Sequence, residues 1–256
     1  MDQLYEAKYH LQERTNWWFE SRRHIILNLL KADTKNSKIL EVGCSGGILI
    51  HALGQIGFRE VYGIDISAKA IELCKSKGIQ NVFIMDGTKT GFGNDQFDTI
   101  IASDVLEHIE REEKALCEWR RLLKPGGKLI VFVPAFSFLW GKHDAANHHY
   151  RRYSKSQLIR VLKEAEFRID RSSYWNFSLF FPTNVVRTVQ RTILKDENKR
   201  GDQLLELNPL TNKLLFCLVK AENIALNAFN FPVGVSVFAI ARKDKASSSP
   251  YLVPPQ

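Results

Sequence analysis

A short apolar run that ends in a glycine-rich turn constrains the fold of this chain most. Residues 39–47 read Ile-Leu-Glu-Val-Gly-Cys-Ser-Gly-Gly, which is typical of a buried strand running into a turn that opens a helix. A second apolar run at residues 63–67, Gly-Ile-Asp-Ile-Ser, ends in a single carboxylate. In such a unit the turn lets a nucleoside-bearing ligand approach the backbone closely, and the acid binds the ribose hydroxyls.

Strand and helix patterns alternate from Ser37 to Pro134. The apolar runs lie at 38–42, 60–66, 81–85, 97–102 and 128–133, and the helical patterns at 46–57, 68–77 and 110–123. Ser67 is placed to cap the second helix, Gly78 to end it, and residues 124–127 to form a sharp turn before the fifth strand. This spacing predicts right-handed crossovers and a doubly wound, mostly parallel α/β sheet of Rossmann-like type.

The chain changes character after Pro134. Residues 135–153 are rich in aromatic residues and histidine without a clear period, and we expect them to form a loop over the carboxyl edge of the sheet. A helix is expected over 156–165 and strands over 167–175 and 233–241. With these two strands the predicted sheet has seven.

A helical insertion separates the last two predicted strands. Its apolar-rich helices are expected at 183–194 and 209–229, joined by the polar residues 195–202. Basic residues lie on or near the side opposite the apolar faces: Arg187, Arg191, Lys195 and Lys199. The pattern permits peripheral contact with a membrane through 178–232, although core packing or a dimer interface is the favoured interpretation.

These patterns divide the chain into four parts. We expect an N-terminal helical and aromatic cap at 1–36 and a cofactor-binding core at 37–177 and 233–243. The insertion occupies 178–232. A Ser/Pro-rich tail at 244–256 is expected to be disordered.

The composition is ordinary for a globular protein, with 45% hydrophobic and 25% charged residues. No signal peptide or membrane-spanning run is expected. The four cysteines are far apart and form no Cys-x-x-Cys pair, which argues against a zinc site or a disulfide framework and favours a cytoplasmic setting. The net charge is +8, and residues 151–200 hold twelve Lys or Arg against five Asp or Glu. Such a segment suits phosphate, anionic lipid, RNA or simple solvation.

The glycine turn favours a cationic cofactor over a dinucleotide. A dinucleotide turn has the pattern Gly-x-Gly-x-x-Gly, whereas Ser45 replaces the middle glycine here and Ile48 the last. Glu41, at the end of the first strand, would repel a pyrophosphate but suits a positively charged ligand. S-Adenosylmethionine carries a sulfonium and an ammonium and has no phosphate, so it meets both conditions. An NAD(P)-dependent Rossmann oxidoreductase is the alternative.

Taken together, the motifs resemble the class I S-adenosylmethionine-dependent methyltransferases, in the group that includes the ubiquinone-pathway O-methyltransferases. The resemblance covers about residues 37–153. Its motifs are, in order, residues 39–47, Gly63-Ile-Asp65, Met85-Asp-Gly87, residues 97–109 (Phe-Asp-Thr-Ile-Ile-Ala-Ser-Asp-Val-Leu-Glu-His-Ile) and residues 122–129 (Leu-Leu-Lys-Pro-Gly-Gly-Lys-Leu).

The resemblance implies a role for each residue of the cofactor site. Glu41 and the turn residues would approach the methionine part of the cofactor; the turn residues are Gly43, Cys44, Ser45 and Gly47. Asp65 would hold the ribose hydroxyls with Ile66 beside it, and Asp86 with Gly87 would bind the adenine amine. Ser103 and Asp104 would line the methyl-donor side.

Histidines near the ends of the fourth and fifth strands are the candidate bases. Methyl transfer from a sulfonium is an in-line displacement that needs alignment and a deprotonated nucleophile. The candidates are His108, His143, His148 and His149. We favour His149 or His143 as contacts to the acceptor, whereas His108 could instead pack beneath a helix.

The string Asp-Val-Leu-Glu-His at 104–108 raises the question of a metal ion. It resembles the Glu-x-x-Glu-His of similar methyltransferases that bind a divalent metal near the acceptor hydroxyl. Asp104 stands at the position of the first glutamate, and its shorter reach argues against ligation. No metal ligand is therefore assigned.

The predicted function is S-adenosylmethionine-dependent methylation, with the oxygen of a small or lipid-linked hydroxyl compound as the acceptor. Methylation of an RNA terminal hydroxyl is a less favoured alternative, since no RNA-binding module is visible. A non-catalytic cofactor-binding domain is a further alternative. The oligomeric state is not predicted.

Overall fold

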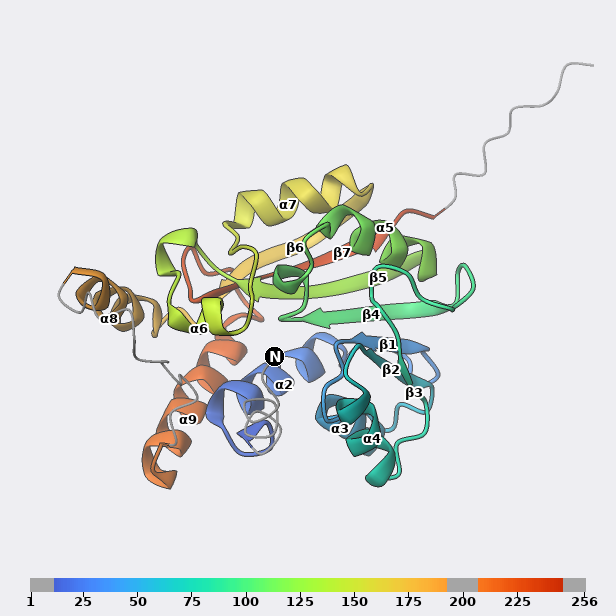
Figure 1. Cartoon of the computed structure of the whole chain (residues 1–256), viewed down its shortest axis with the longest axis horizontal. Coiled ribbons are helices and arrows are strands. Elements are labelled where there is room, and N and C mark those ends of the chain that lie inside the picture. Colours follow the sequence, from blue (N-terminus) through green and yellow to red (C-terminus); the bar gives the residue numbers. More distant parts are fainter. Residues whose placement is uncertain (1–11, 193–206, 246–256) are drawn as a thin grey trace, which may run out of the picture.

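A seven-stranded sheet organises the residues that the computed structural model describes, 12–192 and 207–245 (Figure 1). Its strands are β1 (Ile39–Val42), β2 (Val61–Asp65), β3 (Val82–Ile84), β4 (Phe97–Ser103), β5 (Leu123–Pro134), β6 (Phe167–Trp175) and β7 (Ser236–Lys243). They are ordered β3-β2-β1-β4-β5-β7-β6. Strand β7 pairs antiparallel with both β5 and β6, and the other pairings are parallel. The predicted mostly parallel, doubly wound sheet is confirmed.

Helices cover both faces of this sheet. The α-helices are α2 (Trp17–Leu29), α3 (Ile48–Gln55), α4 (Ala68–Ser76), α5 (Glu112–Leu122), α6 (Lys142–Ala146), α7 (Lys155–Glu164), α8 (Phe180–Thr192) and α9 (Pro209–Ala225), and the 3₁₀ turns are η1 (Leu106–His108) and η2 (Ser137–Leu139). Helices α5 and α7 lie on one face, and α2, α3 and α4 on the other (Figure 1). Ser67 caps α4 by accepting a hydrogen bond from the backbone N–H of Ala70, as predicted.

The residues 124–127 do not form a turn ahead of the fifth strand. Leu123 pairs with Phe97 and Lys128 with Thr99, so these four residues bulge out of β5, which begins at Leu123. Gly126 has a φ of +80° within this bulge, which shows that the local turn chemistry was interpreted correctly. The predicted range 128–133 lies within β5, whose earlier start was missed because its first pairing is a long-range contact.

The segment 135–153 is more regular than the predicted loop. It contains η2 and the short helix α6, whose first turn is held by Asp144 accepting the backbone N–H of Gly141 at 2.8 Å. Helix α8 begins at Phe180, earlier than expected. The predicted end of this helix at 194 and the joining residues 195–202 lie outside the described residues.

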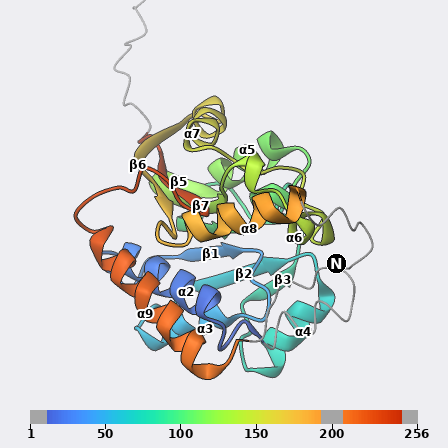
Figure 2. The same ribbon diagram turned by 90° about the vertical axis from the view of Figure 1, so that its left-hand side faces the viewer.

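Helices α2 and α9 pack together, which links the N-terminal part of the chain to the insertion. The side-chain amide of Asn223 on α9 donates to the carbonyl of Ser21 at 3.0 Å, and its oxygen accepts the indole N–H of Trp175 at 2.7 Å. Figure 2 shows α8 and α9 on the same side of the molecule. Among the described residues, no helix has both the length and the hydropathy needed to cross a bilayer. The division into four parts stays a prediction.

Candidate active site

The glycine turn between β1 and α3 brings backbone to the carboxyl edge of the sheet. Gly43 and Gly47 have φ values of +70° and +73°. A Cβ at Gly43 would lie 2.5 Å from Val105 Cγ2, and one at Gly47 would lie 2.6 Å from Ile79 Cδ1, so neither position has room for a side chain. Ser45, which replaces the middle glycine of the dinucleotide pattern, also adopts a positive φ of +46°. The serine therefore keeps a glycine-like backbone, as a close approach of ligand requires.

Asp65 ties this turn to β2. Its two carboxylate oxygens accept the backbone N–H groups of Ser45 and Ser67, each at 2.9 Å. A carboxylate has about four lone-pair sites, and hydroxyl groups are among the donors that it accepts from. The side chain of Ile66 next to it is 77% exposed and presents apolar surface at the same edge.

Glu41 is a buried carboxylate with an unsatisfied oxygen. Its residue is 8% exposed, and Oε2 has no hydrogen-bond partner. Burial, followed by the charge of Glu13, raises the pKa of Glu41 well above its usual range. An uncompensated buried carboxylate is costly unless a cation lies beside it. The site therefore fits a positively charged ligand better than a phosphate.

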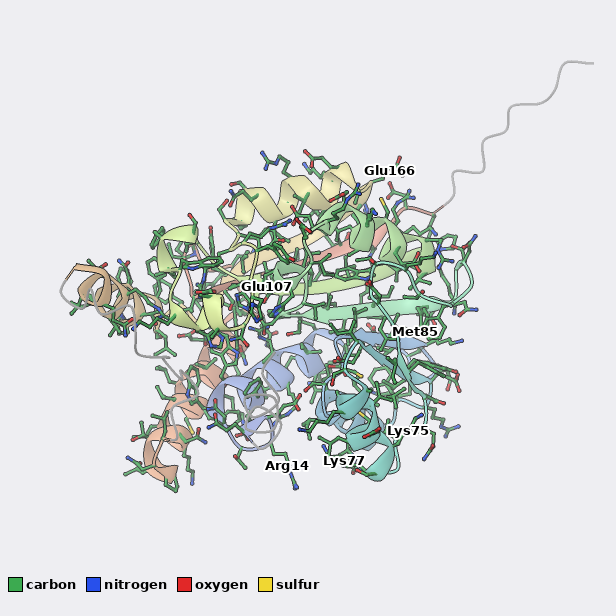
Figure 3. All side chains as sticks on the ribbon, viewed as in Figure 1. Arg14, Lys75, Lys77, Met85, Glu107 and Glu166 are labelled. Atoms are coloured by element: carbon green, nitrogen blue, oxygen red, sulfur yellow. The ribbon has the colours of Figure 1, made fainter. Side chains whose placement is uncertain are left out.

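Charged residues that the sequence motifs did not reveal surround the outer end of the turn. The hydroxyl of Ser45 donates to Glu13 Oε2 at 3.2 Å, and Lys77 Nζ donates to the carbonyl of Gly46 at 2.7 Å. A hollow of about 300 Å³ adjoins the turn and is lined by Arg14, Gly47, Ile48, His51 and Lys77. Arg14 and Lys77 come from distant parts of the chain and lie at one edge of the molecule (Figure 3). This end of the site therefore carries the positive charges of Arg14 and Lys77 together with the Glu13 carboxylate.

The turn after β3 carries the residues expected near the adenine. Asp86 Oδ1 accepts both the backbone N–H and the hydroxyl of Thr88 at 2.8 Å. The carbonyl of Gly87 accepts the indole N–H of the fully buried Trp119 at 2.9 Å. These bonds fix the turn at the edge of the sheet, next to β2.

An arginine from α2 reaches the end of β4. Arg22 Nη1 lies 2.6 Å from Asp104 Oδ2 and donates to the Ser103 hydroxyl at 2.7 Å. Its guanidinium lies 4.6 Å from the ring centroid of Phe132 and 4.4 Å from that of Trp175. The sequence places Arg22 beside an aromatic cluster, but no spacing rule identified it as part of the site.

The three predicted catalytic histidines come together beyond β4 and β5. The ring centroid of His149 is 4.4 Å from that of His108 and 5.9 Å from that of His143. Burial and, next to it, the charge of His149 lower the pKa of His108 to about 4. Burial likewise lowers the pKa of His143 to about 4. His148 is exposed at the surface instead.

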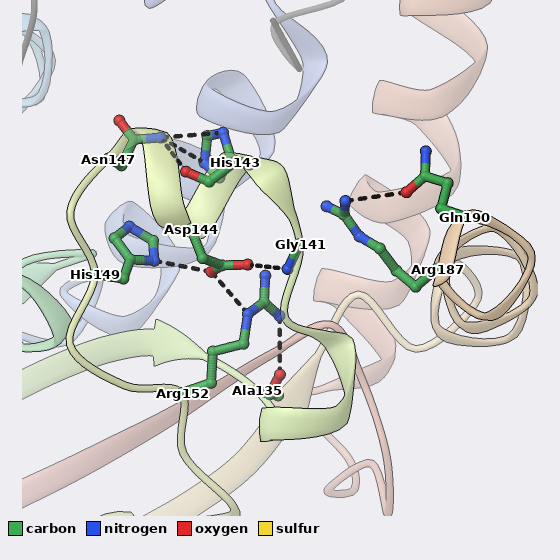
Figure 4. A network of polar contacts seen from close by, with 9 residues as sticks. All are labelled: Ala135, Gly141, His143, Asp144, Asn147, His149, Arg152, Arg187 and Gln190. Atoms are coloured by element: carbon green, nitrogen blue, oxygen red, sulfur yellow. Dashed lines mark hydrogen bonds and ion pairs between the residues drawn. The ribbon is translucent and has the colours of Figure 1, made fainter. Parts of the chain in front are cut away.

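His149 differs from the other two because a carboxylate orients it (Figure 4). Its Nδ1 is 2.9 Å from Asp144 Oδ1, and Arg152 Nε donates to the same oxygen at 2.8 Å. Burial opposes ionisation of Asp144, but the bond with His149 and the Arg152 charge outweigh it and lower the pKa of Asp144. The ionised carboxylate holds the imidazole in one orientation and leaves its Nε2 for another partner.

A second buried carboxylate, Glu107, adjoins these rings. Both of its oxygens are buried without a hydrogen-bond partner. Ligand atoms of Glu107, His108 and His149 all lie within 4.8 Å of one another, so these residues could together hold a divalent ion. Such an ion would lower the pKa of a bound hydroxyl. Asp104, the doubtful ligand in the sequence, pairs with Arg22 instead.

The part of the chain that carries the glycine turn and the end of β4 is similar in sequence to known methyltransferases. Residues 40–131 match a family model described as a methyltransferase domain. A ubiquinone biosynthesis O-methyltransferase of Xanthomonas oryzae is 25% identical over 163 residues, which cover 55% of this chain and 66% of that protein. An uncharacterized protein of Methanocaldococcus jannaschii is 28% identical over 166 residues, covering 61% and 78%. The chain thus matches just under two thirds of the Xanthomonas enzyme.

Solved structures share the fold at low identity. A geranyl diphosphate methyltransferase in complex with S-adenosylmethionine superposes with a TM-score of 0.59 at 13% identity, covering 88% of this chain and 85% of that one. For phosphoethanolamine N-methyltransferase 2 of Haemonchus contortus the TM-score is 0.56 at 19% identity, with coverages of 86% and 52%. The cyclase SpnF has a TM-score of 0.59 at 16% identity, with coverages of 89% and 82%. One fold therefore supports several chemistries, and the acceptor must be argued from the site.

Proposed function

Because the chain is a class I S-adenosylmethionine-dependent methyltransferase, we propose that it methylates the oxygen of a small or lipid-linked hydroxyl compound. The observation that carries this proposal is the pair of His149 and Asp144, 2.9 Å apart, beyond the end of β4. A hydroxyl is a poor nucleophile until a base removes its proton, and an oriented histidine is suited to that task. The similarity to ubiquinone biosynthesis O-methyltransferases supports an oxygen acceptor.

Charges around the glycine turn complement the two ends of the cofactor's amino acid. The buried carboxylate of Glu41 would face the cationic groups, and the hollow with Arg14 and Lys77 would take the carboxylate. Further contacts are proposed from Gly43, Cys44, Ser45, Gly47, Asp65, Ile66, Asp86, Gly87, Ser103 and Asp104. The exposed apolar surface of Ile66 suits a flat base, and the carboxylate of Asp65, at the end of β2, suits the ribose hydroxyls.

In the proposed reaction the protein's own residues align the acceptor and move its proton. Bound S-adenosylmethionine supplies an electrophilic methyl group on a sulfonium. His149 accepts the proton of the acceptor hydroxyl at Nε2, while its Nδ1 hydrogen bonds to Asp144. Arg152 and the backbone N–H of Gly141 hold that carboxylate. The transferred proton then remains on the imidazolium, stabilised by Asp144, until product leaves.

Several arginines of the basic segment 151–200 have partners within the chain. Arg151 pairs with Glu112 at 3.2 Å, and Arg168 pairs with Asp170 at 3.1 Å. Arg171 donates to the carbonyl of Leu226. These contacts favour a small acceptor over an RNA phosphate chain. The cytoplasmic setting stays a prediction.

An acceptor screen with methyl-labelled cofactor tests the proposal. Hydroxylated quinols, sugars and isoprenoid extracts are incubated with the protein, and labelled products are identified by mass spectrometry. We expect an O-methyl ether that His149→Ala no longer forms. Label found only on nitrogen or carboxyl groups would overturn the oxygen acceptor. Calorimetry with S-adenosylhomocysteine checks in parallel that the variant still binds cofactor product.

A further inference from the structure

Helix α8 presents its polar side to the protein and its apolar side to solvent. Thr183, Asn184 and Arg187 are half-buried. Four large apolar residues are exposed, Phe181 (59%), Val185 (61%), Val186 (52%) and Val189 (41%), beside the exposed polar residues Thr188 and Gln190. Residues 181, 185 and 189 are spaced by four and share one face of the helix. A surface helix in water normally has the opposite orientation, with its apolar stripe toward the core.

Helix α9 adds a second exposed stripe. Leu210, Leu214 and Leu218 are 69%, 62% and 41% exposed and are also spaced by four. The opposite face, which includes Val219 and Asn223, is buried against α2. Nine of the fifteen exposed large hydrophobic residues of the described chain lie on 178–232. Both helices lie on the same side of the molecule (Figure 2).

The exposed charges on these helices are basic. Lys213 and Lys220 on α9 are exposed, whereas Arg187 on α8 is half-buried and faces the protein. Glu222 is the one acid in the described part of the two helices, and its carboxylate is buried, accepting the backbone N–H groups of Phe177 and Ser178 at 2.9 and 2.7 Å. Exposed apolar side chains flanked by lysine are a composition that binds an anionic lipid surface. A second copy of this face would instead bring like charges together.

The same face adjoins the candidate active site. The ring of Phe180, at the start of α8, lies 5.5 Å from that of Phe136, just beyond β5. A Cβ at Gly141 would lie 2.1 Å from Arg187 Nη1, so α8 also touches the start of α6, which carries His143 and Asp144. A surface bound through α8 would therefore lie next to the acceptor side of the site.

We propose that α8 and α9 dock this protein on a membrane surface containing anionic lipid and that its hydroxyl acceptor is drawn from that membrane. The docking stands on the surface alone, whereas the origin of the acceptor rests on the proposed function. Phe181, Val185 and Leu214 would enter the boundary between headgroups and acyl chains, and Lys213 and Lys220 would face the anionic headgroups.

Flotation with vesicles tests the docking without any need for activity. The full chain is mixed with vesicles of phosphatidylcholine alone or of phosphatidylcholine with phosphatidylglycerol. We expect flotation with the anionic vesicles and at least a tenfold weaker binding for V185E/L214E. Replacing Lys213 and Lys220 by Gln should weaken binding about fivefold per lysine. I56E, which alters an exposed apolar residue after α3, is the matched control and should float like the parent protein.

Three results would overturn the inference. They are failure of the parent protein to float, equal flotation of V185E/L214E, and self-association on light scattering that the same double variant abolishes without any vesicle binding. Binding of S-adenosylhomocysteine by every variant shows that the fold is intact. Flotation without hydroxyl methylation would refute the proposed function and leave the membrane docking standing. Methylation of a water-soluble hydroxyl acceptor without flotation would refute the docking and leave the proposed function standing.

Discussion

The guanidinium of Arg22 lies 2.6 Å from the carboxylate of Asp104, although the two residues belong to α2 and to the end of β4. The Arg22 side chain is 5% exposed and that of Asp104 is 31% exposed. Asp104 has a φ of +57°, an uncommon conformation for a residue other than glycine. The ion pair therefore joins the N-terminal helix to a strained position at the candidate methyl-donor side.

Replacing Arg22 by Met should lower the free energy of unfolding by about 3 kcal/mol, because it leaves a partly buried carboxylate without its partner. Urea denaturation measures this change. Arg111→Met is the control, since Arg111 and Glu113 form an exposed pair and its loss should cost about 0.5 kcal/mol or less. If the two variants were equally stable, the Arg22 pair would not contribute to the fold.

The sheet could be predicted because its signals are local. The predicted range 167–175 coincides with β6, and Ser67 caps α4 as expected, since alternation and capping depend on neighbouring residues. The start of β5 could not be predicted, because Leu123 pairs with Phe97 across the sheet. The sequence left the orientation of α8 open for a related reason: periodicity locates an apolar face without saying what it contacts.

The candidate site was predictable where a motif carries it. Glu41, Asp65 and the histidines could be chosen from strand ends and turns, and His108, His143 and His149 do cluster. Arg22 could not be chosen, because its contact with Ser103 spans 81 positions in the chain. Glu13 and Lys77 likewise reach the turn from segments without a recognisable motif.

Glu41→Gln should stabilise the unliganded protein and weaken cofactor binding. Burial raises the pKa of Glu41, so the folded state holds this proton more tightly than the unfolded state. Stability is therefore lost as pH rises from the unfolded pKa of about 4.3 toward the raised folded value. Removing the charge should add about 2 kcal/mol of stability at neutral pH, measured by urea denaturation.

The same carboxyl should release its proton when the cationic cofactor binds. Affinity for S-adenosylmethionine should thus increase with pH through the raised pKa of Glu41 and then level off. Calorimetry in two buffers of different ionisation enthalpy detects the released proton, and Glu41→Gln should abolish the release. Glu60→Gln, at an exposed acid that accepts a hydrogen bond from the Tyr62 hydroxyl, is the control and should change nothing. If the Glu41→Gln variant still released a proton on cofactor binding, the proton would come from another group.

His149→Ala should lower kcat by about 10²- to 10⁴-fold, the usual contribution of a positioned base. Asp144→Asn should also lower kcat, since it loses the charge that orients His149 at 2.9 Å. His143→Ala is the matched control and should retain most of the activity. The ring of His143 is contacted by the side-chain amide of Asn147, whereas the ring of His149 is oriented by a carboxylate. Steady-state kinetics with the identified acceptor provides the measurement. Equal losses for His143 and His149 would contradict the assignment.

Glu107→Gln distinguishes a proton-transfer site from a metal site. Burial and then the charge of Asp104 raise the pKa of Glu107, which favours its neutral form in the free protein, and glutamine reproduces the shape of that neutral form. We therefore expect kcat to change by less than about fivefold, equivalent to about 1 kcal/mol, and full activity to survive exhaustive chelation. Loss of activity in both experiments, with restoration of the parent enzyme by one divalent ion, would show instead that Glu107, His108 and His149 ligate a metal. His149 would then be a ligand, and the base would have to be sought elsewhere.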